Sequence, residues 1–246
     1  MRGRTAVVVG AGLVLLLGAA GFLVIDTGAG GLLPGAPDCT VTVGEREVGL
    51  SSAQAASASS TTARVVRRGG TPASAAAALD TELPVADRRL VASALAGRAP
   101  AALTCTQATD AAPGSTRLTP SGLVPRARDV RRELDRVFGR QKVGGFAPGG
   151  VSSGHSPGSA HYEGRAVDVF VRPVTVPNRQ HGWAVAQYLV ANAGRLGVAT
   201  VIFDGRIWTA RRSFQGWRDY APDTRGRSRA VAAILEHRDH VHVDVS

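Results

Sequence analysis

The amino-acid sequence predicts an α+β fold, in which a small and largely antiparallel sheet carries flanking helices. Three kinds of stretch in the C-terminal half predict it. "AVDVFVR" and the terminal "HVHVDV" alternate apolar and polar residues as half-buried strands do. "TVIFDGRIWTA" places Asp204 and Gly205 between two apolar runs, which is the strongest short signal for a β-hairpin. In two further stretches, apolar residues recur at the three- and four-residue spacing of an amphipathic helix.

Two helices are expected to flank this sheet. "PRARDVRRELDRVFG" has apolar residues on one helical face, with Pro125 at its start and Gly139 just beyond its end. "NRQHGWAVAQYLVANAG" also has helical spacing, and we expect Asn178 to be its N-cap. A short helix should precede the terminal strand.

A smaller segment precedes this domain. It begins with the alternating "CTVTVGEREVGL", a hairpin pattern, and continues as Ala-rich stretches, one with Thr71 as N-cap and Pro72 at the first helical position. So few large apolar residues require a disulfide or a packing neighbour for stability. We assign no catalytic role to Glu82 in this segment.

The chain has two cysteines, Cys39 and Cys105. Both follow the apolar N-terminal run, which we expect to direct export, as described below. An even number of cysteines in an oxidising compartment predicts one disulfide. The alternative is a pair of buried free thiols.

The N-terminus has the features of a membrane anchor. Arg2 and Arg4 precede an uncharged run from Thr5 to Ile25, which is long enough to cross a bilayer. The run is longer than the apolar core of a cleaved signal peptide, so we expect an uncleaved single-pass anchor with the C-terminal part extracytoplasmic. The expected organisation is a cytoplasmic stub and transmembrane helix in 1–26, a linker in 27–38, the disulfide-closed helical segment in 39–107, a second linker in 108–122 and a zinc peptidase-like domain in 123–246.

The formal net charge of +10 does not indicate nucleic-acid binding. The positive residues are scattered arginines, with Lys142 the only lysine, and no basic stripe has interleaved aromatic residues. We therefore expect no nucleic-acid partner and a monomeric protein. The Arg-rich stretch 208–229, with its aromatic residues, is a candidate substrate wall or a solvated connector.

Five of the six histidines fall in two clusters. The sixth, His181, lies on the packed face of a helix and is expected to be structural. On the terminal strand, His240 and His242 point to one face together with Asp244, because side chains alternate along a strand. In the earlier cluster, His161 stands seven residues before Asp168.

These side chains predict a metal site if the two strands are neighbours. His161, Asp168 and one histidine of the terminal pair would then supply two nitrogens and one oxygen. Three protein ligands with an open fourth position are typical of catalytic zinc. The alternatives are a solvated His-x-His pair, or a site that holds calcium or no metal.

"SAHYEGRAVDV" resembles the zinc-binding segment of the hedgehog signalling domain. It also fits the Ser-x-His-x-x-Gly-x-Ala-x-Asp pattern of the D-Ala-D-Ala carboxypeptidase and dipeptidase family, here from Ser159 to Asp168. "EHRDHVHVDV" resembles the second hedgehog motif. The resemblance implies a small antiparallel sheet with helices, and His161, Asp168 and His242 as Zn²⁺ ligands.

The resemblance also implies catalytic groups. Glu236 matches the position of a general base and His240 that of a group that assists the oxyanion, while His155 matches a histidine at the rim of the site. The dipeptidases place their base at the position of Asp239, and a group of murein endopeptidases has the spacing of His237, His240 and His242. The base is therefore Glu236, His237 or Asp239, and Glu236 is favoured.

The expected function is that of a membrane-anchored extracytoplasmic zinc peptidase. Its substrates would be peptidoglycan stem peptides, cut by a carboxypeptidase or endopeptidase reaction. The alternative is a non-catalytic module that keeps the metal and binds a cell-wall component or a partner protein.

Overall fold

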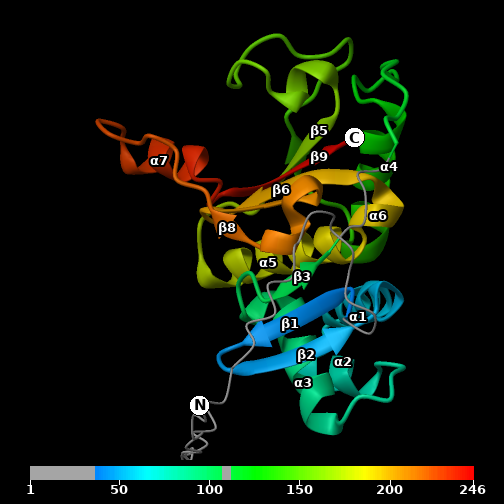
Figure 1. Ribbon diagram of the computed structural model, residues 1–246. Coiled ribbons are helices and arrows are strands. Elements are labelled where there is room, and N and C mark those ends of the chain that lie inside the picture. Colours follow the sequence, from blue (N-terminus) through cyan, green and yellow to red (C-terminus); the bar gives the residue numbers. More distant parts are fainter. Residues whose placement is uncertain (1–36, 107–111) are drawn as a thin grey trace, which may run out of the picture. The chain divides into compact units, whose positions relative to one another are not determined.

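A six-stranded antiparallel sheet forms the centre of the C-terminal half (Figure 1), in a computed structural model that describes residues 37–106 and 112–246. Its strand order is β4-β5-β9-β6-β7-β8, so the terminal strand β9 lies between β5 and β6. The expectation of an antiparallel sheet is confirmed. The strands are β4 (Val143–Gly144), β5 (Ala166–Phe170), β6 (Val198–Phe203), β7 (Arg206–Thr209), β8 (Arg218–Asp219) and β9 (His240–Val245).

The predicted hairpin is the pair β6 and β7. Its turn residues Asp204 and Gly205 both have positive φ, 51° and 74°. Two residues with positive φ define the type I′ turn, whose twist matches that of the strands on either side. The Asp204 carboxylate also accepts a hydrogen bond from Trp183 Nε1 at 3.1 Å, which ties the turn to a helix behind the sheet.

Helices cover one face of this sheet and leave the other face polar. On the covered face, Val241, Val243 and Val245 of β9 are at most 1% exposed. The covering helices are α4 (Pro125–Phe138), α5 (Val176–Ala191) and α6 (Ala193–Leu196), and the remaining elements of this half are the short helices η2 (Ala160–Glu163), η3 (Ala210–Gln215) and α7 (Arg229–Leu235).

Helix α5 begins earlier than expected. Its N-cap is Thr175, which is extended (φ −125°, ψ 164°) and whose hydroxyl accepts a hydrogen bond from Asn178 N at 3.3 Å. The prediction of Asn178 as N-cap is therefore wrong. Asn178 lies in the first turn, where its side-chain amide donates to Pro173 O instead.

A three-stranded sheet and four helical elements form the N-terminal segment. Cys39 and Cys105 pair directly across β1 and β3 and form the predicted disulfide, which closes a loop 66 residues long. A loop of that length corresponds to roughly 4 kcal/mol by the chain-entropy estimate. Strand β3 was not predicted. The elements are β1 (Cys39–Val43), β2 (Arg46–Leu50), α1 (Ser52–Arg67), α2 (Pro72–Ala77), α3 (Val85–Ser93), η1 (Ala94–Arg98) and β3 (Leu103–Cys105), with sheet order β2-β1-β3.

Helix α5 joins this segment to the larger sheet. Its Gln187 is fully buried; Oε1 accepts from Leu103 N at 2.9 Å and Nε2 donates to Ala94 O at 2.8 Å. One continuous hydrophobic core runs through both halves, and all described residues belong to one compact unit. The packing neighbour that the N-terminal segment needs is therefore α5.

The apolar run from Thr5 to Ile25 lies outside the described residues. Within 37–106 and 112–246, no helix combines the length and the apolar character needed to span a bilayer.

We predict that Gln187→Leu destabilises the full-length protein. The substitution leaves Leu103 N–H and Ala94 C=O buried without partners, and each unsatisfied group costs about 1–3 kcal/mol. Gln180→Leu is the matched control, since Gln180 lies on the same helix but is partly exposed. Denaturant unfolding gives the free energy of unfolding, and equal values for the two variants would contradict the role given to Gln187.

Glu133 of α4 bonds to both neighbouring helices. Its Oε1 accepts hydrogen bonds from Arg136 at 2.8 Å, Tyr188 Oη at 2.6 Å and Arg195 at 2.7 Å. The bond from Arg136, with those from Tyr188 and Arg195, outweighs burial and lowers the pKa of Glu133 from 4.5 to about 2. A folded-state pKa below the unfolded value stabilises the fold above the unfolded pKa.

We predict that Glu133→Gln lowers the free energy of unfolding at pH 7 by about 1–3 kcal/mol. The difference from wild type should shrink as the pH falls from 4.5 towards 2, because Glu133 then takes up a proton in the folded state too. Asp129→Asn, on the same helix with a side chain 58% exposed, should change stability little. A difference that does not depend on pH would exclude this account.

Candidate metal centre

Strands β5 and β9 bring the two histidine clusters together. They pair antiparallel with Asp168 directly opposite His242, so both side chains project from the polar face of the sheet. His240 lies two residues before His242 and projects from the same face. All three side chains are buried, at 6–8% residue exposure.

Helix η2 places His161 over these strands. Ser159 is its N-cap, and the Ser159 hydroxyl accepts a hydrogen bond from His161 N at 3.4 Å. Gly164 ends the helix in the left-handed conformation, with φ +67°. A Cβ at Gly164 would lie 2.5 Å from Leu118 Cδ2 and 2.6 Å from Gly122 O, so the predicted tight turn requires glycine here.

Three potential ligand atoms converge at this point. His161 Nε2 lies 3.1 Å from His242 Nδ1 and 3.2 Å from Asp168 Oδ1. The third distance, between His242 Nδ1 and Asp168 Oδ1, is also 3.2 Å. The three atoms thus form a nearly equilateral triangle.

Each imidazole has a second ring nitrogen that points away from the triangle. The partner of that nitrogen determines whether the nitrogen in the triangle carries a proton or a lone pair. His161 Nδ1 lies 2.7 Å from Gly145 O, an acceptor, so Nδ1 carries a proton and neutral His161 presents a lone pair on Nε2. His242 Nε2 faces the Asp244 carboxylate at 3.4 Å, which favours a lone pair on His242 Nδ1. Two nitrogen lone pairs and a carboxylate oxygen therefore meet, and only a cation or added protons relieve their repulsion.

A metal ion fits this arrangement. Tetrahedral ligands at bond lengths of 2.0–2.1 Å are about 3.3–3.4 Å from one another, close to the sides of this triangle. Carbonyl and carboxylate partners on the outer nitrogens are also the usual supports of metal-binding histidines. His155 is a further candidate donor that could act in place of His242, since His155, His161 and Asp168 offer ligand atoms within 4.8 Å of one another. This donor set suits zinc and other metals that bind imidazole.

His155, expected at the rim of the site, packs against His161. Its ring stacks on that of His161, with centroids 3.9 Å apart and planes 17° from parallel. Its backbone N–H donates to Tyr162 Oη at 3.0 Å. Burial and the neighbouring His161 lower the pKa of His155, which favours its neutral, metal-binding form.

Gly145 is a functional residue that the sequence analysis missed. With φ +81°, its carbonyl reaches His161 Nδ1, and a Cβ there would lie 2.4 Å from that nitrogen and 3.0 Å from Asp168 Oδ2. The only signal in the sequence is the Gly144-Gly145 pair ahead of the histidine motif.

Asp168 and His242 stabilise each other's charged forms in the absence of an ion. Burial opposes ionisation of Asp168, but hydrogen bonds from His161 and His242 keep its pKa well below the usual range. Burial also opposes the charge on His242, yet the bonds to Asp168 and Asp244 raise its pKa to about 9. A metal ion would displace the His242 proton on binding.

His240 and Asp239 form a hydrogen-bonded pair beside the triangle. His240 Nδ1 lies 2.7 Å from Asp239 Oδ1, and Arg172 Nε donates to Asp239 Oδ2 at 2.6 Å. These contacts orient His240 so that its Nε2 lies 3.8 Å from Asp168 Oδ1. Asp239 therefore holds His240 in place.

The side chain of His237 lies next to the histidines of the site, whereas that of Glu236 bonds to an arginine. His237 has a positive φ of 54°, and its ring centroid lies 4.5 Å from that of His240 and 5.7 Å from that of His242. The Glu236 carboxylate instead bonds Arg238 Nε at 2.5 Å. In the described part of the chain, Glu236 is not among the residues that line the pocket over the triangle.

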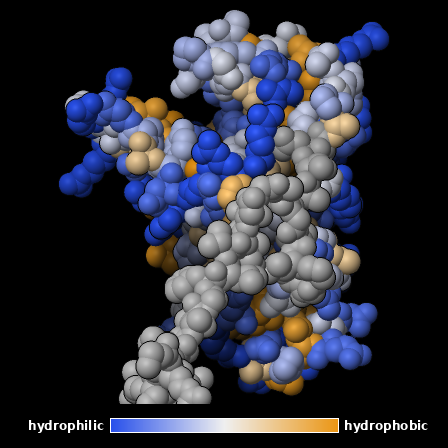
Figure 2. All heavy atoms as spheres, in the orientation of Figure 1, coloured by the Kyte–Doolittle hydropathy of each residue, from blue (hydrophilic) through white to orange (hydrophobic). Residues whose placement is uncertain are grey.

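That pocket has a volume of about 450 Å³. His161, His242, His237, Tyr220 and Asp244 all line it. The space-filling view shows a hollow between the arm that carries α7 and the loop around η2 (Figure 2). The triangle is therefore open on one side, as a fourth ligand requires.

The fold and the site define an α+β domain with a candidate metal centre on the polar face of its sheet. The family model described as "VldE, C-terminal domain" matches residues 119–231. The match covers slightly less than half of the chain; it includes His161 and Asp168 and ends before His242. The chain is thus similar to this family over that stretch. The searches of curated proteins and of solved structures gave no match.

We predict that His161→Ala, Asp168→Asn and His242→Ala each abolish stoichiometric metal binding by the full-length protein. Asp244→Asn, which removes only an outer hydrogen bond, should weaken metal affinity by about 10–100-fold. His181→Ala is the matched control, because His181 bonds Gln141 away from the site. Elemental analysis after dialysis measures the bound metal, and wild-type content in the three ligand variants would rule out this site.

Proposed function

We propose that this protein is a zinc-dependent peptidase that acts on peptides of the cell wall. The observation that carries the proposal is the triangle of His161, Asp168 and His242, whose open side faces a pocket. Two nitrogens and one oxygen with an open fourth position are the ligand set of catalytic zinc. When bound there, zinc would polarise a carbonyl and lower the pKa of water to about 7.

The surrounding residues supply the proton transfers. His237 lines the pocket, and its Nδ1 lies 3.0 Å from Leu235 O, an acceptor, so Nε2 has the lone pair. Burial, with the charges of His240 and His242, lowers the pKa of His237 to about 3. His237 is therefore neutral at physiological pH. So low a pKa makes it a weak base, and its assignment rests on geometry: its Nε2 lone pair is free to accept the proton of the attacking water, which would then pass to the leaving amine.

This geometry favours His237 over Glu236 as the general base. The Glu236 carboxylate is held by Arg238, and Asp239 is engaged by His240 and Arg172. On the motif resemblance we assign His240, oriented by Asp239, to the oxyanion that forms at the attacked carbonyl. It can donate from Nε2 only as the imidazolium, because Asp239 accepts its Nδ1–H.

The substrate class rests on the motif resemblance. "SAHYEGRAVDV" and "EHRDHVHVDV" resemble motifs of hedgehog domains and D-Ala-D-Ala peptidases, and the second of these families cuts bonds next to D-amino acids. The apolar run from Thr5 to Ile25 supports an anchor that leaves the site on the side of the membrane where the cell wall lies. We infer a carboxypeptidase or endopeptidase of peptidoglycan stem peptides.

We predict that zinc-loaded full-length protein cuts stem peptides ending in D-Ala-D-Ala or their cross-linked dimers. His237→Ala should lower kcat by about 10²–10⁴-fold, the usual contribution of a general base, with zinc content unchanged. Glu236→Ala should change kcat by no more than a few-fold. Mass spectrometry of the products gives the scissile bond and the rates.

The other outcomes are equally informative. Loss of turnover in Glu236→Ala with His237→Ala still active would reverse the assignment of the base. A fully zinc-loaded wild type that cuts none of these peptides, while a known peptidase cuts them, would instead support a binding module with the same metal site.

A further inference from the structure

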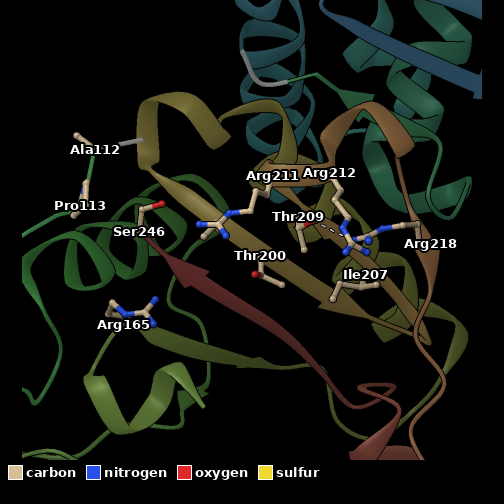
Figure 3. Close-up of a pocket in the computed structure, with 11 residues that line it drawn as sticks. Ala112, Pro113, Arg165, Thr200, Ile207, Thr209, Arg211, Arg212, Arg218 and Ser246 are labelled. Atoms are coloured by element: carbon tan, nitrogen blue, oxygen red, sulfur yellow. Dashed lines mark hydrogen bonds between the residues drawn. The ribbon is translucent and has the colours of Figure 1, made fainter. Parts of the chain in front are cut away.

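A second pocket, of about 760 Å³, lies beside the metal centre on the same polar face of the sheet. Its floor is formed by β6 and β7 through Thr200, Ile207 and Thr209. Four arginines from three segments surround it (Figure 3): Arg165 before β5, Arg211 and Arg212 on η3, and Arg218 on β8.

The two pockets adjoin each other. Arg165 and Thr200 line both of them. Thr200 on β6 pairs with Asp244 on β9, and Ile202 pairs with His242. A molecule bound at the triangle can therefore extend along β6 into the second pocket.

The side chains around this second pocket carry positive charge. Its described lining residues include no aspartate or glutamate, and the carboxyl end at Ser246 is held by Arg126. Arg212 forms no ion pair with a carboxylate in the described part of the chain, and Arg165 pairs with Glu163, whose side chain is 57% exposed. Several guanidinium groups around one cavity repel each other unless an anion lies between them.

Arg218 adds an unsatisfied donor. Its guanidinium bonds Thr209 Oγ1 at 2.9 Å, but its Nε is buried and has no hydrogen-bond partner. Buried donors normally have an acceptor, so Arg218 has a hydrogen-bonding capacity that its neighbours do not use fully. The fork of an arginine matches the paired oxygens of a carboxylate.

We infer that this pocket is a subsite for a carboxylate of the substrate, distant in the chain from the bond that is cut. The inference rests on the proposed function for the identity of the substrate, an acidic peptide. Arg212 and Arg218 are its main contacts. The subsite selects peptides that carry a free carboxylate over their amidated counterparts, because an amide offers neither the charge nor the second acceptor oxygen.

The test has two arms, both with full-length protein. In the first, calorimetry measures binding of citrate, a free-carboxylate probe that requires no cleavage, to the metal-free protein, because citrate would otherwise bind the zinc itself. In the second, which uses the zinc-loaded protein, kcat/KM is measured for two stem peptides that are identical except at one position, where one peptide has glutamate and the other has glutamine. The variants are Arg212→Gln and Arg218→Gln, with Arg206→Gln as control, since Arg206 pairs with Asp219 and does not line the pocket.

Wild type and Arg206→Gln should bind citrate and prefer the glutamate peptide. Arg212→Gln and Arg218→Gln should bind citrate at least about tenfold more weakly, or about 1.4 kcal/mol, and lose the preference. Arg212 is exposed, so its variant keeps the test valid if Arg218→Gln does not fold.

The two proposals fail separately. If the arginine variants lose citrate binding but wild type cuts no peptide, the proposed subsite stands and the proposed peptidase activity is rejected. Peptide cleavage with citrate affinity and peptide preference equal in all variants would retain the peptidase and overturn the subsite.

Discussion

The register of β9 against β5 is the constraint on which the site depends. It sets His242 directly opposite Asp168, and it places Val241 and Val243 in the core. A slip of one residue would exchange the two faces of β9, burying imidazoles against α5 and exposing valines. The apolar core therefore enforces the register, and the register brings two of the three ligand atoms within 3.2 Å.

The position of the third atom, His161 Nε2, depends on the short helix η2 and on two glycines, Gly145 and Gly164. Gly145 provides a carbonyl for His161 Nδ1, and Gly164 ends η2 so that the chain can enter β5. Because each position also excludes a Cβ on steric grounds, the orientation of His161 is set by backbone as much as by side chains. Helix α5 supports the sheet from behind and shares Gln187 with the N-terminal segment.

Sequence patterns predicted the parts of this structure that local rules control. Alternation in "HVHVDV" gave the face of His240 and His242, Asp204-Gly205 gave the hairpin, and the cysteine pair gave the disulfide. The N-cap of α5 was misplaced because Thr175 and Asn178 are both good caps, and only the extended backbone at Thr175 distinguishes them.

The geometry around the triangle lay beyond those rules. The motifs left Glu236, His237 and Asp239 as candidates for the base and favoured Glu236, since motif positions do not show where a side chain points. The left-handed backbone at His237 and the Arg238 partner of Glu236 separate them, and both are tertiary features. Three arginines of the second pocket, Arg211, Arg212 and Arg218, lie within the stretch 208–229 that the sequence offers as a candidate substrate wall. Only the fourth, Arg165, is distant in sequence, and the fold brings it to the others.

The polar face of the sheet therefore has two neighbouring regions that favour ligands of opposite charge. At one end, the lone pairs of His161, Asp168 and His242 favour a cation or added protons; at the other, the arginines favour an anion. Direct contact between the two ends would let an arginine replace the metal as the partner of Asp168, and would place guanidinium charge against the ion. Neutral Ile202 and Ile207 lie between His242 on β9 and Arg218 on β8, and Asp244 bonds His242, while Arg165 borders both pockets. This separation allows one extended ligand to satisfy both ends.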